Sequence, residues 1–301
     1  MTHPTRLYVP AITPFRSDLS VDTDRFVAHS RLLLADGADG LACFGTTSEA
    51  NSMSVAERME ALDALLDAGI PPDRLIPGTG CAALPDTIAL TRHAVERGVL
   101  GTLTLPPFYY KPISEDGHFA AYARVIEAVG SQNLRLYLYH IPQMSGVPIT
   151  LTVIERLLKA YPRTVVGLKD SSGNWDNTAA VIAAFPELET YSASEALLVR
   201  NVAAGGAGCI SASANVNVRG IMALIRGLGG GDEAALLDQV STVRKIFEGL
   251  PLIPGIKAAI AHRLNDPAYA IVRPPFVQLP ASFDAAIATA AQLCFGGKQD
   301  E

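Results

Sequence analysis

The chain has 301 residues, of which 49% are hydrophobic and 18% are charged, and its formal net charge is −6. Such a chain can bury a large core, and an acidic balance without runs of Lys or Arg argues against a nucleic-acid surface. The apolar stretches are short and interrupted by charges, so we expect neither a membrane span nor a secretory signal. Four scattered cysteines without CxxC spacing indicate reduced thiols and favour a cytoplasmic protein.

Short apolar stretches alternate with amphipathic helical stretches along the chain. The expected strands cover residues 7–13, 40–44, 75–78, 101–105, 134–141, 165–170, 188–193 and 208–211. The expected helices between them cover residues 21–36, 54–68, 85–97, 114–129, 150–160, 175–185 and 195–203. Further helical patterns towards the C-terminus cover residues 232–248, 254–263 and 282–294.

Eight strand–helix units in about 220 residues are typical of a parallel (β/α)8 barrel in the α/β class. We therefore predict a TIM barrel over residues 1–219 that carries the active site. Residues 220–301 are expected to form a C-terminal helical extension packed on the barrel. The alternative is a doubly wound open sheet, but no GxGxxG motif follows the first strand to support it.

Lys169 is the most informative single residue, because it ends an apolar strand and precedes a loop rich in Ser and Gly. A lysine is rarely buried unless it is paired or functional. Burial disfavours the ammonium form and leaves an amine that can attack a carbonyl to form a Schiff base. The alternatives are an ion pair with Asp170 or a side chain that reaches solvent from the strand end.

Two other strand ends carry polar groups that suit the same chemistry, because catalytic groups of a barrel lie at the carboxyl ends of its strands. The turn 45–49, Gly-Thr-Thr-Ser-Glu, offers hydroxyls and backbone amides for a small carboxylate, or is an ordinary helix-approach loop with capping residues. Tyr139 ends the fifth strand and can transfer protons if its hydroxyl is hydrogen-bonded; otherwise it is a core residue. Lys169 follows one strand–helix unit later, so Tyr139 and Lys169 are expected on adjacent strands.

Several motifs resemble those of the dihydrodipicolinate synthase/N-acetylneuraminate lyase superfamily. They are Val-Pro-Ala-Ile-Thr-Pro-Phe at 9–15, the turn 45–49, Pro-Phe-Tyr-Tyr at 107–110, Tyr-His-Ile-Pro at 139–142, Gly-Leu-Lys-Asp at 167–170 and Gly-Gly-Ala-Gly-Cys-Ile-Ser at 205–211. The resemblance covers nearly the whole chain in order. It implies class I aldolase chemistry on pyruvate or a 2-oxo acid without metal or cofactor, in a homo-oligomer that is usually a tetramer or dimer of dimers.

The resemblance also implies roles for individual residues. Lys169 would form the Schiff base, and Tyr139 would shuttle the proton. Thr46 and Thr47 would hold the substrate carboxylate, and the Thr47 hydroxyl would also link Tyr139 to Tyr109 of a neighbouring subunit. The residues expected to line the pocket beside the imine are Gly208 and Ile210.

Three positions depart from the family pattern, and one of them is Ser48, which stands where glycine is common. Met144 stands where dihydrodipicolinate synthases carry an arginine that grips the carboxylate of the aldehyde substrate, so lysine-biosynthetic condensation is disfavoured. His140 stands where asparagine is common, and we interpret it as a structural histidine in preference to a group that titrates in the pocket. Residues that could bind a polyhydroxylated substrate tail are Ser171, Ser194 and Glu195, although helix capping also explains the last two.

The sequence therefore predicts a Schiff-base-forming lyase that cleaves a keto-deoxy sugar acid, a sialic-acid-like substrate or another 2-oxo acid. The alternatives are a dihydrodipicolinate synthase-type condensation, a 2-oxo acid dehydratase that uses the same imine, and a non-catalytic ligand-binding homologue. Beyond its small-molecule substrate and copies of itself, no nucleic-acid or membrane partner is expected. Lys257 also lies in apolar surroundings, and we interpret it as a stem that snorkels to solvent.

Overall fold

Parallel strands curl around a common axis at the centre of the molecule, and a computed structural model describes residues 3–295. The strands are β1 (Arg6–Val9), β2 (Gly40–Leu41), β3 (Thr102–Thr104), β4 (Leu136–His140), β5 (Val165–Asp170), β6 (Glu189–Ser192) and β7 (Gly208–Ile210). Their order in the sheet is β2-β1-β7-β6-β5-β4-β3. Parallel bridges from Leu41 to Leu75 and from Gly78 to Leu103 place the segment 75–78 between β2 and β3. This eighth segment closes the predicted TIM barrel.

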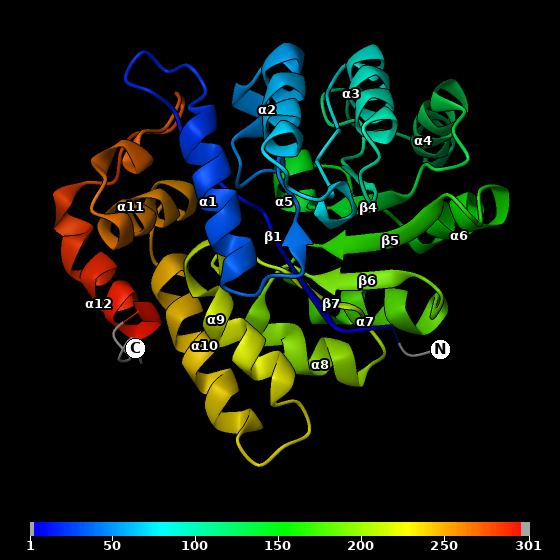
Figure 1. Cartoon of the computed structure of the whole chain (residues 1–301). Coiled ribbons are helices and arrows are strands. Elements are labelled where there is room, and N and C mark those ends of the chain that lie inside the picture. The colour runs from blue at the N-terminus through cyan, green and yellow to red at the C-terminus, as the bar shows by residue number, and fades with distance from the viewer. Residues whose placement is uncertain (1–2, 296–301) are drawn as a thin grey trace.

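Helices follow the strands and surround the barrel (Figure 1). They are α1 (Thr23–Ala35), α2 (Val55–Asp67), α3 (Leu84–Glu96), α4 (Glu115–Val129), α5 (Pro142–Ser145), α6 (Leu151–Ala160), α7 (Trp175–Ala184), α8 (Leu198–Ala203) and α9 (Ala214–Arg226). Short 3-10 helices are η1 (Ala50–Ser52), η2 (Pro72–Arg74), η3 (Glu195–Leu197), η4 (Pro267–Ala270) and η5 (Ala281–Phe283). No helix in this described part of the chain combines the length and apolar character needed to cross a bilayer.

The C-terminal extension consists of α10 (Glu233–Glu248), α11 (Leu252–Leu264) and α12 (Asp284–Phe295). In Figure 1 the orange and red helices α11 and α12 lie on the side towards which the arrows of β5 and β6 point. The extension has its own apolar cluster, which also takes in Ile12 and Val216 from the barrel. Helix α9 spans residues 219 and 220, where the sequence placed the boundary, so we propose that the extension begins after α9.

Successive side chains of each strand point alternately into the barrel and outwards to the surrounding helices. Leu136, Leu138 and Leu168 pack outwards in a cluster with α4 and α6, whereas Tyr137 and Tyr139 belong to the interior cluster. The ring of Tyr137 fills the interior because β5 carries Gly167 opposite it: a Cβ on Gly167 would lie 2.3 Å from the Tyr137 ring. Lys169, two residues after Gly167, therefore also faces inwards.

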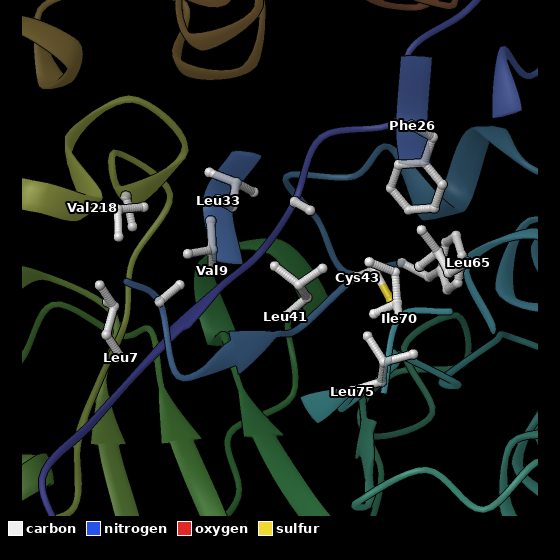
Figure 2. Packing of buried hydrophobic residues seen from close by; sticks show 14 of the residues in the cluster. Leu7, Val9, Phe26, Leu33, Leu41, Cys43, Leu65, Ile70, Leu75 and Val218 are labelled. Atoms are coloured by element: carbon white, nitrogen blue, oxygen red, sulfur yellow. The ribbon is translucent and has the colours of Figure 1, made fainter. Parts of the chain in front are cut away.

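A second apolar cluster holds β1 and β2 against the helices α1, α2 and α9 (Figure 2). Its fully buried members shown there include Leu7, Val9, Phe26, Leu33, Leu41, Cys43, Leu65 and Leu75. Burying such side chains is worth about 1.5–3 kcal/mol each relative to exposure. This packing fixes the strand from which the turn 45–49 emerges.

Candidate active site

Lys169 lies on the inner face of β5, one residue before the strand ends, and only 4% of it is exposed. Its register partner on β4 is Tyr139. Lys169 Nζ lies 3.4 Å from Tyr139 Oη and 4.4 Å from the centre of the Tyr139 ring. The expected placement of these two residues on adjacent strands is confirmed, and it brings an amine and a phenol into direct contact.

The Asp170 carboxylate does not pair with Lys169, which removes the simplest structural explanation of this lysine. Asp170 is the next residue on β5 and faces outwards, where it accepts hydrogen bonds from Ser172 N, Asn177 Nδ2 and Thr178 Oγ1, each 2.8 Å long. No ion pair of Lys169 occurs within residues 3–295. The amine is therefore buried without a carboxylate partner in the described chain.

The turn 45–49 brings a third polar group to the same place. Thr46 Oγ1 lies 3.2 Å from Tyr139 Oη, which completes a row of Thr46, Tyr139 and Lys169. The sequence analysis assigned this contact to Thr47, and that assignment is wrong. The Thr47 side chain is buried and makes no hydrogen bond among the described residues. The threonine that touches the tyrosine is the one on the more open side of the turn.

The backbone of the turn leaves successive donors free within the described chain, the Gly45 amide among them. The amides of Ser48, Glu49 and Ala50 donate to carbonyls within the turn, at 3.1–3.2 Å. The amides of Thr46 and Thr47 have no acceptor within residues 3–295. Successive free N–H groups of this kind form a concave site for an anion. The turn can therefore hold a small carboxylate close to the Lys169 amine.

Tyr109 lies on the loop between β3 and α4 and is 72% exposed. Its ring packs edge-on against Tyr110, with centroids 5.3 Å apart. It makes no hydrogen bond to the described part of its own chain. Within one chain the structure does not bring Tyr109 to Tyr139, so its predicted role depends on a neighbouring copy.

The two residues predicted to line the pocket from β7 lie at different depths. Ile210 ends β7 and belongs to the interior cluster together with Tyr139. Gly208 begins β7, where it pairs with Arg6 of β1 and Tyr191 of β6. Its φ is +116°, and a Cβ there would lie 2.1 Å from the Arg6 carbonyl oxygen. The structure thus explains Gly208 by close strand packing, and its contact with an imine stays a prediction.

The three residues proposed for a hydroxylated substrate tail differ in their surroundings. Ser171 follows Asp170, and its Oγ is buried without a hydrogen-bond partner in the described chain. Ser194 Oγ accepts from Ala196 N at 3.3 Å, so it caps η3. Glu195 is fully buried, and its two oxygens accept hydrogen bonds from nearby hydroxyls of Ser211 and Ser213. The prediction that Glu195 is open to a substrate tail is therefore corrected: only Ser171 has an unused hydroxyl.

Comparisons with known proteins decide the family. The profile of the dihydrodipicolinate synthetase family matches residues 3–292. An uncharacterised DapA-like lyase of Chloroflexus aurantiacus is 37% identical over 299 residues, which cover 99% of each chain. The chain belongs to the dihydrodipicolinate synthetase family. It is accordingly a DapA-like lyase of the class I type.

Solved structures of this fold agree with that assignment. Dihydrodipicolinate synthase of Agrobacterium tumefaciens is 31% identical, with a TM-score of 0.85 over 96% of this chain and 99% of that one. YagE of E. coli, solved in complex with pyruvate, is 24% identical and has the same fold, with a TM-score of 0.83 over 96% and 97% of the two chains.

Met144 is the residue that the sequence analysis expects to distinguish this dihydrodipicolinate synthetase family member from the synthases it resembles. It lies on α5, is 61% exposed and borders a cavity of about 180 Å³ beside Thr46. The other residues that line this cavity are Asn51, Leu105, Phe108, Ile141 and Ser145. None of the described residues that line it has a basic side chain, and the Lys111 ammonium beside it donates to the Ser145 carbonyl at 3.2 Å.

His140, another departure from the family pattern, is a structural residue as predicted. It lies on the outer face of β4 and is buried. Its Nδ1 accepts the Ile149 amide at 3.1 Å, and burial lowers its pKa below the usual value. A neutral histidine with a fixed backbone partner secures the chain after α5 and does not enter the pocket.

Sequence reasoning missed Lys257, which it interpreted as a snorkelling stem. Lys257 is fully buried and forms an ion pair with Glu49, the last residue of the turn 45–49. The apolar surroundings of Lys257 in the sequence were the available signal, since a stem that snorkels needs an exposed end. Its partner is 208 residues away, and nothing local identifies it.

Proposed function

We propose that this family member is a Schiff-base-forming lyase that catalyses reversible aldol cleavage of a 2-oxo acid, with pyruvate as the retained half. The observation that carries the proposal is the Lys169 amine, buried, free of any carboxylate in the described chain and 3.4 Å from the Tyr139 hydroxyl. The pyruvate complex of YagE, a protein of the same fold, is consistent with this substrate class.

Imine formation follows from the positions of the three polar groups. The free amides of Thr46 and Thr47 would hold the 2-oxo acid carboxylate, which turns its keto carbon towards Lys169. Lys169 Nζ attacks that carbon, and the C–N bond forms as the keto oxygen takes a proton from Tyr139. The nitrogen then gives up one proton, which passes through Tyr139 to this oxygen, and the oxygen leaves as water. A protonated imine and the deprotonated Tyr139 remain. Thr46 holds the tyrosine hydroxyl in place during both transfers.

The cleavage step uses the imine as an electron sink. Tyr139 accepts the proton of the substrate C4 hydroxyl, the C3–C4 bond breaks, and its electron pair moves into the imine to give an enamine. The C4 fragment leaves as an aldehyde. Protonation of the enamine at C3 and hydrolysis of the imine then release pyruvate and restore Lys169. The Tyr139 hydroxyl is thus the group that donates or accepts the proton in these steps.

The cavity beside Met144 supports an aldehyde half that carries no carboxylate. Its lining is mostly apolar, and a carboxylate desolvated there would have no basic partner among the described lining residues. We therefore keep a condensation of the dihydrodipicolinate synthase type as the disfavoured alternative. Among the three residues proposed for a hydroxylated tail, Ser171 has the unused oxygen that could bind a hydroxyl group of the aldehyde half.

We also propose that a second copy of the chain contributes to the site. Tyr109 and Tyr110 expose most of their surface on one loop, which fits burial against a second chain. We propose a homo-oligomer, with a tetramer as the expected state, in which Tyr109 extends the row of Thr46 and Tyr139 in the neighbouring site. Light scattering after gel filtration would measure the assembly.

Borohydride trapping with pyruvate tests the proposal. Intact mass and peptide mapping should find a reduced pyruvate adduct on Lys169, and Lys169→Ala should abolish it. The mapping also separates Lys169 from Lys257, the other buried lysine of residues 3–295. A folded wild-type protein that forms no adduct at high pyruvate concentration would overturn the proposal.

A coupled assay for released pyruvate then separates the remaining reaction types. A lyase yields pyruvate and an aldehyde from a C4-hydroxylated 2-oxo acid, whereas a dehydratase yields a longer 2-oxo acid and no pyruvate. A protein that traps pyruvate but turns over neither kind of substrate would fit a ligand-binding homologue.

A further inference from the structure

The C-terminal extension reaches the active-site turn through a buried ion pair. Lys257, on α11, donates a hydrogen bond to Glu49 Oε1, and both side chains are fully buried. Lys257 Nζ also donates to the Ile271 carbonyl at 2.7 Å and lies 4.3 Å from the centre of the Phe15 ring. A buried charge pair of this kind needs such additional partners to offset its desolvation.

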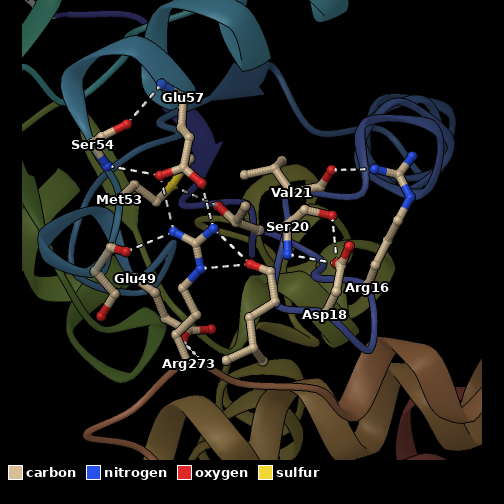
Figure 3. A network of polar contacts seen from close by, with 12 residues as sticks. Arg16, Asp18, Ser20, Val21, Glu49, Met53, Ser54, Glu57 and Arg273 are labelled. Atoms are coloured by element: carbon tan, nitrogen blue, oxygen red, sulfur yellow. Dashed lines mark hydrogen bonds and ion pairs between the residues drawn. The ribbon is translucent and has the colours of Figure 1, made fainter.

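Arg273 also contacts Glu49 and the segment that follows the turn (Figure 3). Its backbone N–H donates to Glu49 Oε2 at 3.0 Å, so both oxygens of Glu49 are bound by the C-terminal region. Its guanidinium forms an ion pair with Glu57 of α2 and donates to the Ser52 carbonyl at 2.7 Å. The segment that follows the turn, from η1 to the start of α2, is therefore fixed by the same arginine.

The backbone of the turn needs this support. Glu49 has φ 56° and ψ 33°, the left-handed region that residues other than glycine rarely adopt. Phe44, just before the turn, also has a positive φ of 58°. Such conformations persist only where surrounding contacts fix them. The Glu49 carboxylate is held by Lys257 and by the Arg273 amide. The Glu49 backbone is held by two local hydrogen bonds, from its amide to Thr46 O and from the Ser52 amide to its carbonyl.

We propose that Lys257 is a positioning residue for the active-site turn, acting through Glu49 to hold the Thr46 and Thr47 amides where a substrate carboxylate binds. The part about the carboxylate rests on the function proposed above. Without Lys257, the Glu49 carboxylate would be buried with one charged partner removed, and it would have to leave its pocket or take up a proton. Either change releases the side chain that keeps the left-handed backbone in place.

The test compares two cations of the same helix. Lys257→Met removes the pair with Glu49, whereas Arg263→Met removes the pair of α11 with Asp36, 2.8 Å long, at the end of α1. Hydrogen exchange of the peptide covering residues 45–53 should accelerate by about tenfold or more in Lys257→Met and stay at the wild-type rate in Arg263→Met. The pyruvate concentration that half-saturates trapping should rise by about tenfold or more in Lys257→Met only, since a small displacement of the cradle suffices.

Hydrogen exchange keeps the two proposals separate. If wild-type protein forms no imine, the proposed function fails, while accelerated exchange of residues 45–53 in Lys257→Met still supports the positioning of the turn. Wild-type exchange of that peptide in Lys257→Met would overturn the positioning role. If Lys257→Met does not fold, the double variant Lys257→Met/Glu49→Gln takes its place in the exchange experiment, because it removes both charges of the buried pair. Equal exchange in that double variant and wild type would then overturn the proposal.

Discussion

Lys169 and Lys257 show how the surroundings of a lysine decide its use. Both are buried, but Lys257 has a carboxylate partner, and burial lowers its pKa to about 8 although Glu49 opposes the shift. Lys169 faces the Tyr139 hydroxyl and has no carboxylate partner in the described chain. The sequence singled out Lys169 because a strand pattern runs directly into a Ser/Gly loop. It could not single out Glu49 as the partner of Lys257.

Tyr139→Phe tests the proton transfer at this scale. The ring that packs on Lys169 stays, so the protein should fold normally, but the proton donor next to the amine is lost. We expect the rate of pyruvate release to fall by roughly 10²–10⁴-fold, the usual worth of one positioned acid–base group. Stopped assays with a cleavable 2-oxo acid would measure the rate.

Tyr191→Phe is the matched control for that change. Tyr191 is also buried inside the barrel, on the strand next to Lys169, but its hydroxyl donates to Glu189 at 3.0 Å. Its loss should leave the rate within a few-fold of wild type. Equal losses in Tyr139→Phe and Tyr191→Phe would mean that barrel packing, and not proton transfer, is being measured.

At the scale of the elements, the sequence predicted every strand–helix unit that carries the proposed chemistry but missed α9. The stretch Ala214–Arg226 begins with Asn and Val residues, which are weak helix formers, and contains Gly220. The structure shows why the pattern is weak: Asn217 leaves helical geometry at φ −128° and ψ 36°. The register of Tyr139 and Lys169 was predictable because one strand–helix unit separates them. The choice between Thr46 and Thr47 was not, since turn geometry decides it.

Gly208→Ala tests how tightly β7 joins β1. The new Cβ would lie 2.1 Å from the Arg6 carbonyl oxygen at a φ of +116°. Backbone strain and overpacking together should lower the free energy of unfolding by about 2–5 kcal/mol, as measured by urea denaturation. Gly69→Ala is the control, because Gly69 has φ +83° with nothing within 4 Å of the added methyl. Equal losses at both positions would show that strain alone, without the strand contact, sets the effect.

Across the whole molecule, contacts between distant segments are what the sequence did not reveal. The sequence offers Glu195 either as a partner of a substrate tail or as a helix-capping residue, whereas Ser211 and Ser213 bind its oxygens and Arg244 of α10 lies 3.9 Å away. Lys257 likewise meets the turn 45–49 across most of the chain. Periodicity predicts which residues are buried on one element, but it does not say which elements meet at the rim of a barrel.

Buried histidines should make the fold sensitive to acid. Burial lowers the pKa of His118, on α4, to about 4, and that of His29 likewise to about 4. An unfolded histidine takes up its proton near pH 6.5, so the unfolded state binds more protons between pH 6.5 and 4. Stability is therefore present above pH 6.5 and is lost as the pH falls towards 4. His118 stacks on Tyr122, with centroids 5.4 Å apart, so phenylalanine can replace it.

Between pH 7 and pH 4.5 the unfolding free energy of wild type should fall by roughly 2–3 kcal/mol more than that of His118→Phe. The variant lacks the buried imidazole that takes up a proton more readily in the unfolded state. Urea unfolding at the two pH values measures the difference. His262→Gln, at an exposed position on α11, should show the wild-type pH dependence. If His118→Phe loses as much stability as wild type, the His118 imidazole takes up its proton as readily in the fold as in the unfolded chain, and the acid sensitivity must come from His29 or the carboxylates.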